Sequence, residues 1–163
     1  MTVLIMAAGT GGHVFPALSI AQKLREHNVR TEWMGTHQGM ENQLLEGTGI
    51  KIHAVSAKGL KGKGVVRLLF APFMLVQALI QSIRVLTSVN PDCVLGMGGF
   101  VSGPGGLAAK ITGRKLVIHE QNAVPGFTNK LLSKIANLVF EAFPNTFPSS
   151  DKVLYTGNPL RSE

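Results

Sequence analysis

Short apolar runs alternate along this chain with longer segments in which apolar residues recur at helical spacing. The apolar runs cover residues 2–6, 31–34, 50–55, 92–96, 115–118, 138–141 and 152–155, and each predicts a β-strand. A nearly continuous apolar strand such as the first is typical of a parallel sheet that is covered on both faces. Strands that alternate with helices favour an α/β fold built on a doubly wound parallel sheet.

The segment after the first strand has the pattern of an amphipathic helix. Ala17, Ile20, Ala21 and Leu24 fall at i, i+3, i+4 and i+7, and polar side chains occupy the opposite face. Pro16 precedes them and suits the first turn of a helix. Further helices are predicted at residues 39–45, at 125–136 and in a segment that ends near residue 111.

Residues 68–80 form the most apolar segment, which only Pro72 and Gln77 interrupt. Gln77, Gln81 and Arg84 fall on one helical stripe, so the segment predicts a helix with a single polar face. We expect most of this helix to lie in the core. The alternative for the residues near Pro72 is an exposed position, which concerns Leu68, Leu69, Phe70 and Phe73. The apolar run is shorter than the about 20 residues that span a bilayer.

Positive charge is concentrated in one part of the chain. The 163 residues fit one domain, the formal charge is +7, and no acidic residue occurs between Gly47 and Pro91. Six basic residues fall in that stretch: Lys51, Lys58, Lys61, Lys63, Arg67 and Arg84. Such a stretch indicates an anionic partner, which is nucleic acid, phosphate or a membrane surface, or else a solvated basic face.

Two features bear on the cellular compartment. The single cysteine, Cys93, has no second cysteine for an internal disulfide, which favours a reducing compartment. Because Cys93 lies in an apolar strand, we expect a buried structural thiol and not a nucleophile. No basic residue precedes the short apolar start of the chain, which does not have the pattern of a signal peptide.

Two glycine-rich loops each follow a predicted strand and precede a predicted helix. The first is Gly9-Thr10-Gly11-Gly12-His13, and the second runs from Gly96 to Gly106 and includes Gly98 and Gly99. Glycines at such a junction let backbone N–H groups approach an anion. The two loops would together hold a diphosphate, or one would hold a donor and the other an acceptor.

The first loop does not match a dinucleotide-binding fingerprint. Val14 stands where a third glycine is needed, and no acidic residue occurs after the second strand near Gly35 or Thr36. A nicotinamide-dependent enzyme is therefore disfavoured. No cysteine pair and no His-Glu-x-x-His motif is present, so the sequence predicts no metal site of the usual kind.

His13 lies at the mouth of the first loop, near the first helical turn. The positive end of a helix favours the neutral form of an imidazole, and a neutral imidazole accepts a proton. His13 is therefore a candidate general base, and the alternative is a histidine that only caps a turn.

Four hydrogen-bonding residues, His119-Glu120-Gln121-Asn122, follow the fifth predicted strand at the same edge of the sheet. They indicate either a binding site or a polar turn. Neighbouring side chains in an extended segment point to opposite sides, so we expect His119 and Glu120 to pair with partners elsewhere and not with each other.

Four motifs occur in order over nearly the whole chain: residues 9–17 (GTGGHVFPA), 96–106 (GMGGFVSGPGG), 119–122 (HEQN) and 157–161 (GNPLR). Together they resemble the MurG family of inverting GT-B glycosyltransferases, whose members have two Rossmann-like domains with a cleft between them. The resemblance implies that residues 1–157 are the Rossmann-like, acceptor-side N-terminal half. Residues 158–163 would then begin the linker to a C-terminal donor domain.

The resemblance also implies a reaction. N-acetylglucosamine passes from UDP-GlcNAc to the C4 hydroxyl of the N-acetylmuramyl unit of lipid I, with inversion, and gives lipid II. UDP-GlcNAc is then the donor substrate, no tightly bound cofactor is expected, and dependence on a divalent metal stays open. The N-terminal half alone should bind donor poorly and transfer little sugar.

Family positions can be carried over residue by residue. Those for the donor match Thr10, Gly11, Gly12, Asn122 and Arg161, and Gly98 and Gly99 are further expected substrate contacts. Those near the acceptor or the reacting centre match His13, His119, Glu120 and Asn129. His13 is the first choice for the general base and Glu120 the second. Phe100 departs from the family pattern, in which many members have tyrosine.

For the basic stretch, the resemblance favours an anionic membrane as the partner, because lipid I is anchored in one. The expected membrane patch consists of Lys61, Lys63, Arg67, Leu68, Leu69, Phe70 and Phe73. The implied location is the cytoplasmic face of the bacterial inner membrane, with peripheral attachment. Nucleic acid is disfavoured, since the chain has one Trp, one Tyr and no stacking pattern beside its lysines.

Two alternatives stay open. One is another GT-B transferase or a nucleotide-sugar epimerase of similar fold, which tests of different acceptors would separate. The other is a membrane- and acceptor-binding module that needs a second chain for catalysis.

Overall fold

A single parallel sheet organises the molecule. The computed structural model describes residues 1–57 and 65–159, with residues 65–70 described by their backbone only. The strands are β1 Thr2–Met6, β2 Arg30–Thr36, β3 Lys51–Val55, β4 Cys93–Gly96, β5 Lys115–Glu120, β6 Leu138–Glu141 and β7 Val153–Tyr155. Their order is β3-β2-β1-β4-β5-β6-β7, and all six pairings are parallel. The predicted doubly wound α/β sheet is confirmed.

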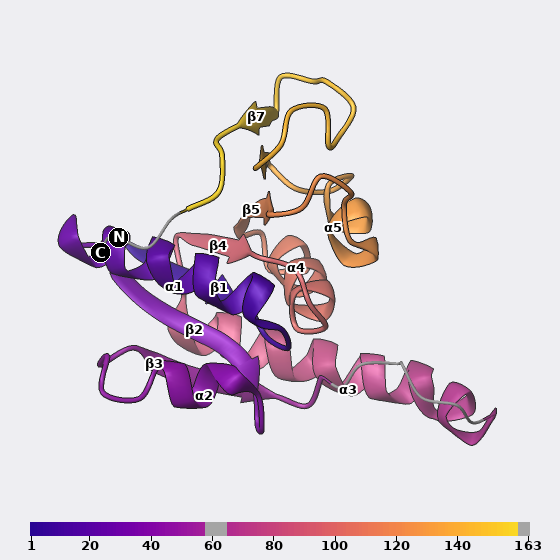
Figure 1. Ribbon diagram of the computed structural model, residues 1–163. Helices are drawn as coiled ribbons and strands as arrows, with labels where there is room; N and C mark the ends of the chain where they lie inside the picture. Colours follow the sequence, from indigo (N-terminus) through magenta and orange to yellow (C-terminus); the bar gives the residue numbers. More distant parts are fainter. Residues whose placement is uncertain (58–64, 160–163) are drawn as a thin grey trace.

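Helices cover both faces of this sheet (Figure 1). They are α1 Gly11–Glu26, α2 Met40–Leu44, α3 Val65–Val89, α4 Ser102–Ile111 and α5 Phe127–Leu132. Alternate residues of β1 enter two separate cores: Val3 and Ile5 pack with α1, while Leu4 and Met6 pack with α3 and α4. This double burial explains why β1 is apolar at every position from Val3 to Met6.

The strand order reverses at β1, which pairs with β2 on one side and β4 on the other. Met6 lies beside Gly96 in the register of β1 and β4, so these strands end together. Both glycine loops therefore leave the sheet side by side. In doubly wound sheets this reversal point is where ligands bind.

Several element boundaries differ from the prediction, and three of the differences concern elements of the candidate site. Helix α1 begins at Gly11, so Pro16 lies inside the helix and not in its first turn. Strand β5 extends through Glu120, so His119 and Glu120 end the strand instead of following it. Helix α5 covers Phe127–Leu132 and is shorter than the predicted 125–136.

The expectation that the apolar helix lies mostly in the core is wrong. Helix α3 is 25 residues long, and its exposed side chains include Phe73 (70% exposed), Val76 (53%) and Ile80 (45%). Its buried stripe contains small residues such as Ala78, because α3 packs closely on the Gly- and Ala-rich α4. Periodicity locates the polar stripe of a helix but does not show how much of the apolar surface a neighbour covers.

Among the described residues, one segment, Ala71–Val89, is long and apolar enough to cross a membrane by length and composition alone. The predicted run of residues 68–80 was therefore too short. A helix packed on the core of a globular domain passes the same test, and α3 contributes buried Leu86 to the core.

Candidate active site at the reversal point of the sheet

The two glycine loops touch each other where β1 and β4 end. Gly98 and Gly99 have φ values of +93° and +81°, which side chains other than glycine rarely adopt. A Cβ atom on Gly98 would lie 3.0 Å from Cε1 of His13, and one on Gly99 would lie 2.5 Å from the carbonyl oxygen of Ala8. The absence of side chains at both glycines therefore allows the second loop to pack against His13 and the first loop.

The N-terminus of α1 is open to a ligand. Thr10 is the exposed N-cap residue, and its side chain makes no capping hydrogen bond. Gly11 is half-buried and Gly12 exposed, and their N–H groups have no acceptor within the helix, whereas the N–H groups of His13 and Val14 both donate to the carbonyl oxygen of Thr10. Free N–H groups and the helix dipole make this end favourable for negative charge.

A chain of hydrogen bonds connects three elements of the site. Nδ1 of His13 lies 3.1 Å from Oε1 of Gln121, and Nε2 of Gln121 lies 3.3 Å from Nδ1 of His119. Nε2 of His119 lies 3.0 Å from the carbonyl oxygen of Gly157. His13 is half-buried, and its Nε2 has no hydrogen-bond partner among the described residues. Of the two histidines in this hydrogen-bond chain, His13 is thus the one that a substrate can reach.

His119 is inside the protein, with 3% of its surface exposed. Burial lowers the pKa of His119, and this effect outweighs the hydrogen bond to Gly157 and the charge of Glu120, which both act in the opposite direction. His119 is therefore held neutral.

Glu120 holds a loop together through its carboxylate. It is 1% exposed, and Oε1 accepts hydrogen bonds from the backbone N and Nδ2 of Asn122 at 3.0 Å each. Oε2 accepts from the backbone N of Gly126 at 3.1 Å and from Nδ2 of Asn129 at 2.9 Å. Four donors occupy the carboxylate, so this geometry supports a positioning role more directly than proton transfer from a substrate.

The predicted site residues at this edge come together in space. His119 and Glu120 pair with separate partners, which confirms the expectation that they do not pair with each other. Nδ2 of Asn129 joins them by also donating to the carbonyl oxygen of His119 at 3.1 Å. Gln121 also belongs to this site, although no family position was carried over to it. The signal that could have identified it is its place in the polar run at the end of β5.

Several predicted residues are not placed by the structure. Lys61, Lys63 and Arg161 lie outside the described residues. Arg67, Leu68, Leu69 and Phe70 lie in α3 by their backbone, and their side chains are not described. Phe73 is the member of the expected membrane patch whose side chain is placed, and it is exposed.

An apolar cavity of about 810 Å³ opens between α3, α4 and α5. Its lining includes Met74 and Leu79 of α3, Leu107 of α4 and Leu131 of α5. Phe100 of the second glycine loop also lines it, so the cavity adjoins the candidate active site.

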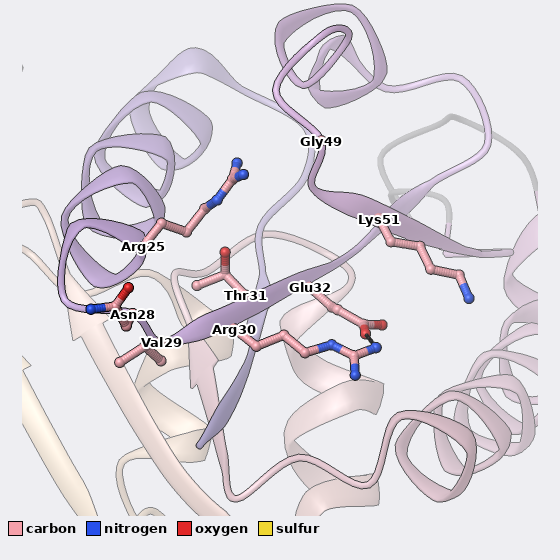
Figure 2. A pocket seen from close by; sticks show the side chains of 8 residues that line it. All are labelled: Arg25, Asn28, Val29, Arg30, Thr31, Glu32, Gly49 and Lys51. Carbon is pink, nitrogen blue, oxygen red and sulfur yellow. Dashed lines mark hydrogen bonds and ion pairs between the residues drawn. The ribbon is translucent and has the colours of Figure 1, made fainter.

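A second cavity, of about 430 Å³, lies at the opposite edge of the sheet (Figure 2). Arg25, Arg30 and Lys51 line it, and buried Glu32 pairs with Arg30 and, at 2.6 Å, with Nε2 of His53. Burial opposes the charge of Glu32, but the hydrogen bonds from His53 and Arg30 outweigh it and lower the pKa of Glu32. This cavity contains none of the predicted site residues.

The expected burial of Cys93 can be compared with the structure. Cys93 is half-buried, not fully buried as expected, and burial raises the pKa of its thiol. Within residues 1–57 and 71–159, no three His, Cys, Asp or Glu side chains gather as metal ligands.

Comparison with known proteins gives consistent relatives. The Glycosyltransferase family 28 N-terminal domain matches residues 3–141. The chain is 55% identical over 161 residues to the "UDP-N-acetylglucosamine--N-acetylmuramyl-(pentapeptide) pyrophosphoryl-undecaprenol N-acetylglucosamine transferase" of Ectopseudomonas mendocina, and 53% identical to that of Azotobacter vinelandii. Each match covers 99% of this chain and 45% of the relative, so the chain spans about half the length of these relatives.

Solved structures agree with this result. The crystal structure of Acinetobacter baumannii MurG superposes with a TM-score of 0.84 at 50% identity, over 95% of this chain and 45% of that chain. The UDP-GlcNAc 2-epimerase of Neisseria meningitidis, solved bound to UDP-GlcNAc, has a TM-score of 0.74 at 22% identity, over 98% of this chain and 47% of that one. The second likeness shows a shared fold. The family match and the identity to full-length relatives show more, namely that this chain belongs to glycosyltransferase family 28 and forms its Rossmann-like N-terminal domain.

Proposed function

We propose that this chain is the acceptor-side half of an enzyme that transfers N-acetylglucosamine from UDP-GlcNAc to the C4 hydroxyl of N-acetylmuramic acid in lipid I. The name of its relatives, at 55% and 53% identity, supports this substrate pair. Residues 1–157 form the catalytic N-terminal unit, and residues 158–163 lead into a C-terminal half that supplies the rest of the donor site.

The position of His13 is the main support for this proposal. Its Nε2 is free of hydrogen bonds to described residues and lies where the two glycine loops meet. In the reaction, the acceptor oxygen attacks the anomeric carbon, Nε2 takes the hydroxyl proton, and the bond to UDP breaks on the opposite face, which inverts the configuration. Thr10, Gly11 and Gly12 at the N-terminus of α1 offer N–H groups to the leaving diphosphate.

A transfer assay tests the reaction. Labelled UDP-GlcNAc is mixed with a short-chain lipid I analogue and with this chain, first alone and then with the C-terminal half supplied. We expect transfer only in the second mixture. His13→Ala should then lower kcat by about 10²- to 10⁴-fold, because that is what a positioned general base contributes.

His27→Ala is the matched control, since His27 is exposed at the far end of the same helix and should leave the rate unchanged. Absence of transfer with both halves folded would rule out this acceptor and leave another GT-B transferase or a nucleotide-sugar epimerase. Full activity of His13→Ala would show that His13 is not the general base, and Glu120 would then be the next candidate.

We also propose that α3 attaches the protein peripherally to the cytoplasmic face of the bacterial inner membrane. Phe73, Val76 and Ile80 expose apolar side chains at helical spacing, and the surrounding stretch has no acidic residue. Lys61, Lys63 and Arg67 precede them in sequence. Each basic residue near an anionic surface contributes about 1 kcal/mol.

Vesicle pelleting tests the attachment. The chain should pellet with vesicles that contain an anionic phospholipid, and less so with neutral vesicles or at high salt. Phe73→Ser should weaken pelleting, whereas Leu154→Ser, an exposed apolar position on β7, should not. Equal effects of the two substitutions would refute a specific role for α3.

A further inference from the structure

The hydrogen-bond chain from His13 to Gly157 has one consistent direction. The carbonyl oxygen of Gly157 only accepts, so Nε2 of His119, at 3.0 Å, carries the hydrogen. His119 is buried and neutral, and its Nδ1 therefore has a lone pair that accepts a hydrogen bond. Nε2 of Gln121 donates to this lone pair across 3.3 Å.

The amide of Gln121 is fixed by a second acceptor. Its Nε2 also lies 3.1 Å from the carbonyl oxygen of His119 and 3.9 Å from the sulfur of Met97. If the amide were turned over, its oxygen would face that carbonyl oxygen at the same distance, and two acceptors would repel each other. Oε1 of Gln121 must therefore point toward His13.

The geometry points to Gln121 as a positioning residue that fixes the tautomer of His13. Because Oε1 of Gln121 only accepts, Nδ1 of His13 at 3.1 Å must carry the hydrogen, and the lone pair of the neutral ring is on Nε2. Nε2 is the nitrogen without a partner among the described residues. The structure thus presents the basic nitrogen outward before any substrate binds.

What this tautomer does in catalysis rests on the proposed transfer reaction. The proton of the acceptor hydroxyl passes to Nε2 of His13 as the new glycosidic bond forms and the bond to UDP breaks. The resulting imidazolium keeps its Nδ1–H bond to Gln121, whose neutral amide orients the ring but does not receive the proton. The packing of the ring over Gly98 helps to hold this orientation.

The tautomer can be measured without substrate. The ¹⁵N and ¹³C chemical shifts of labelled His13 in this chain report which ring nitrogen carries the hydrogen at a pH where the ring is neutral. We expect the Nδ1–H form in the wild type and a mixture of both forms in Gln121→Leu. Gln121→Glu should keep the Nδ1–H form, because one carboxylate oxygen also accepts from Nδ1; the other oxygen then faces the carbonyl oxygen of His119, so this variant should also be less stable than the wild type. Gln22→Leu, an exposed glutamine on α1, is the matched control and should change nothing.

Transfer kinetics, measured with the C-terminal half supplied, give a second test of the role of Gln121. Gln121→Leu should lower kcat by about 10- to 100-fold with little change in KM. This loss is smaller than the about 10²- to 10⁴-fold that a general base contributes, because part of the His13 population still has the productive tautomer. Gln121→Glu should restore most of the rate and move the acidic limb of the pH–rate profile to higher pH, since a carboxylate stabilises the imidazolium.

A purely structural role for Gln121 would not give this pattern. It would lower the rate in Gln121→Leu and Gln121→Glu alike and leave the pH–rate profile unmoved. The Nε2–H form in wild-type His13 would overturn the inference even if neither variant folds. The NMR measurement does not require sugar transfer. If His13 has the Nδ1–H form but no transfer occurs, the proposed function is refuted and the positioning role of Gln121 is not.

Discussion

Replacing Gly99 by alanine adds one methyl group where the second glycine loop touches the first. Gly99 has a φ of +81°, and an L-residue in a left-handed conformation costs roughly 1–2 kcal/mol. The new Cβ would also lie 2.5 Å from the carbonyl oxygen of Ala8, and the backbone must move until that gap reaches at least 3.0 Å. Overpacking of this kind costs about 1–3 kcal/mol, so the total loss of stability should be about 2–5 kcal/mol.

Gly113→Ala separates the two contributions. Gly113 has a φ of +70°, and a Cβ there would meet no atom within 4 Å, so this variant should lose only the conformational part, about 1–2 kcal/mol. Urea unfolding gives both values from the shift in midpoint at an unchanged slope. In a domain of this size each kcal/mol also lowers Tm by about 2–4 °C.

The difference between the variants is the deciding quantity. Equal losses in Gly99→Ala and Gly113→Ala would mean that the second loop does not press on Ala8, and the close packing of the two glycine loops would be refuted. A larger loss in Gly99→Ala, with a drop in sugar transfer that Gly113→Ala does not share, would place that contact in the active site.

Three further predictions concern the rest of the domain. The pKa of Glu32 is lowered in the folded chain although burial opposes this. The ionised carboxylate therefore stabilises the fold fully above the unfolded pKa near 4.5, and this stabilisation is lost as pH falls through the lower folded pKa. Glu32→Gln should flatten the pH dependence of the unfolding free energy, measured in urea, below about pH 5. Leu86→Ala should cost about 2–5 kcal/mol because Leu86 is fully buried, and Leu75→Ala on the exposed face of α3 should cost less than about 1 kcal/mol in the same assay. Burial raises the pKa of Cys93, so its reaction with an aromatic disulfide at neutral pH should be slow in the folded chain and speed up strongly in urea.

Local patterns in the sequence predict much of this fold. The seven strands are visible because each is a short apolar run, and both glycine loops are visible because each separates such a run from a helical pattern. The placement of His13 in the first turns of α1 follows from the same pattern. The start of α1 at Gly11 is not visible, since glycine has low helix propensity and Pro16 seemed to mark the first turn.

Features that depend on contacts between distant segments are not predictable in this way. Gln121 contacts His13 across 108 residues of chain, and no spacing rule relates the two. The exposure of Val76 and Ile80 depends on which neighbour covers α3, which periodicity does not report. The carboxylate of Glu120 accepts four hydrogen bonds only because the following loop folds back and places the N–H of Gly126 beside it.

The central position of β1 also determines when the site can form. β1 pairs with β4, and Thr2 and Asp92, which are joined by a hydrogen bond, are 90 residues apart. At a synthesis rate of about 5–20 residues per second, β1 waits roughly 5–18 s on the ribosome for this partner. The second glycine loop follows β4, so His13 meets Gly98 only after that long-range pairing is made. The contact between the two glycine loops is thus made late in folding, and a chain that ends before β4 cannot form it.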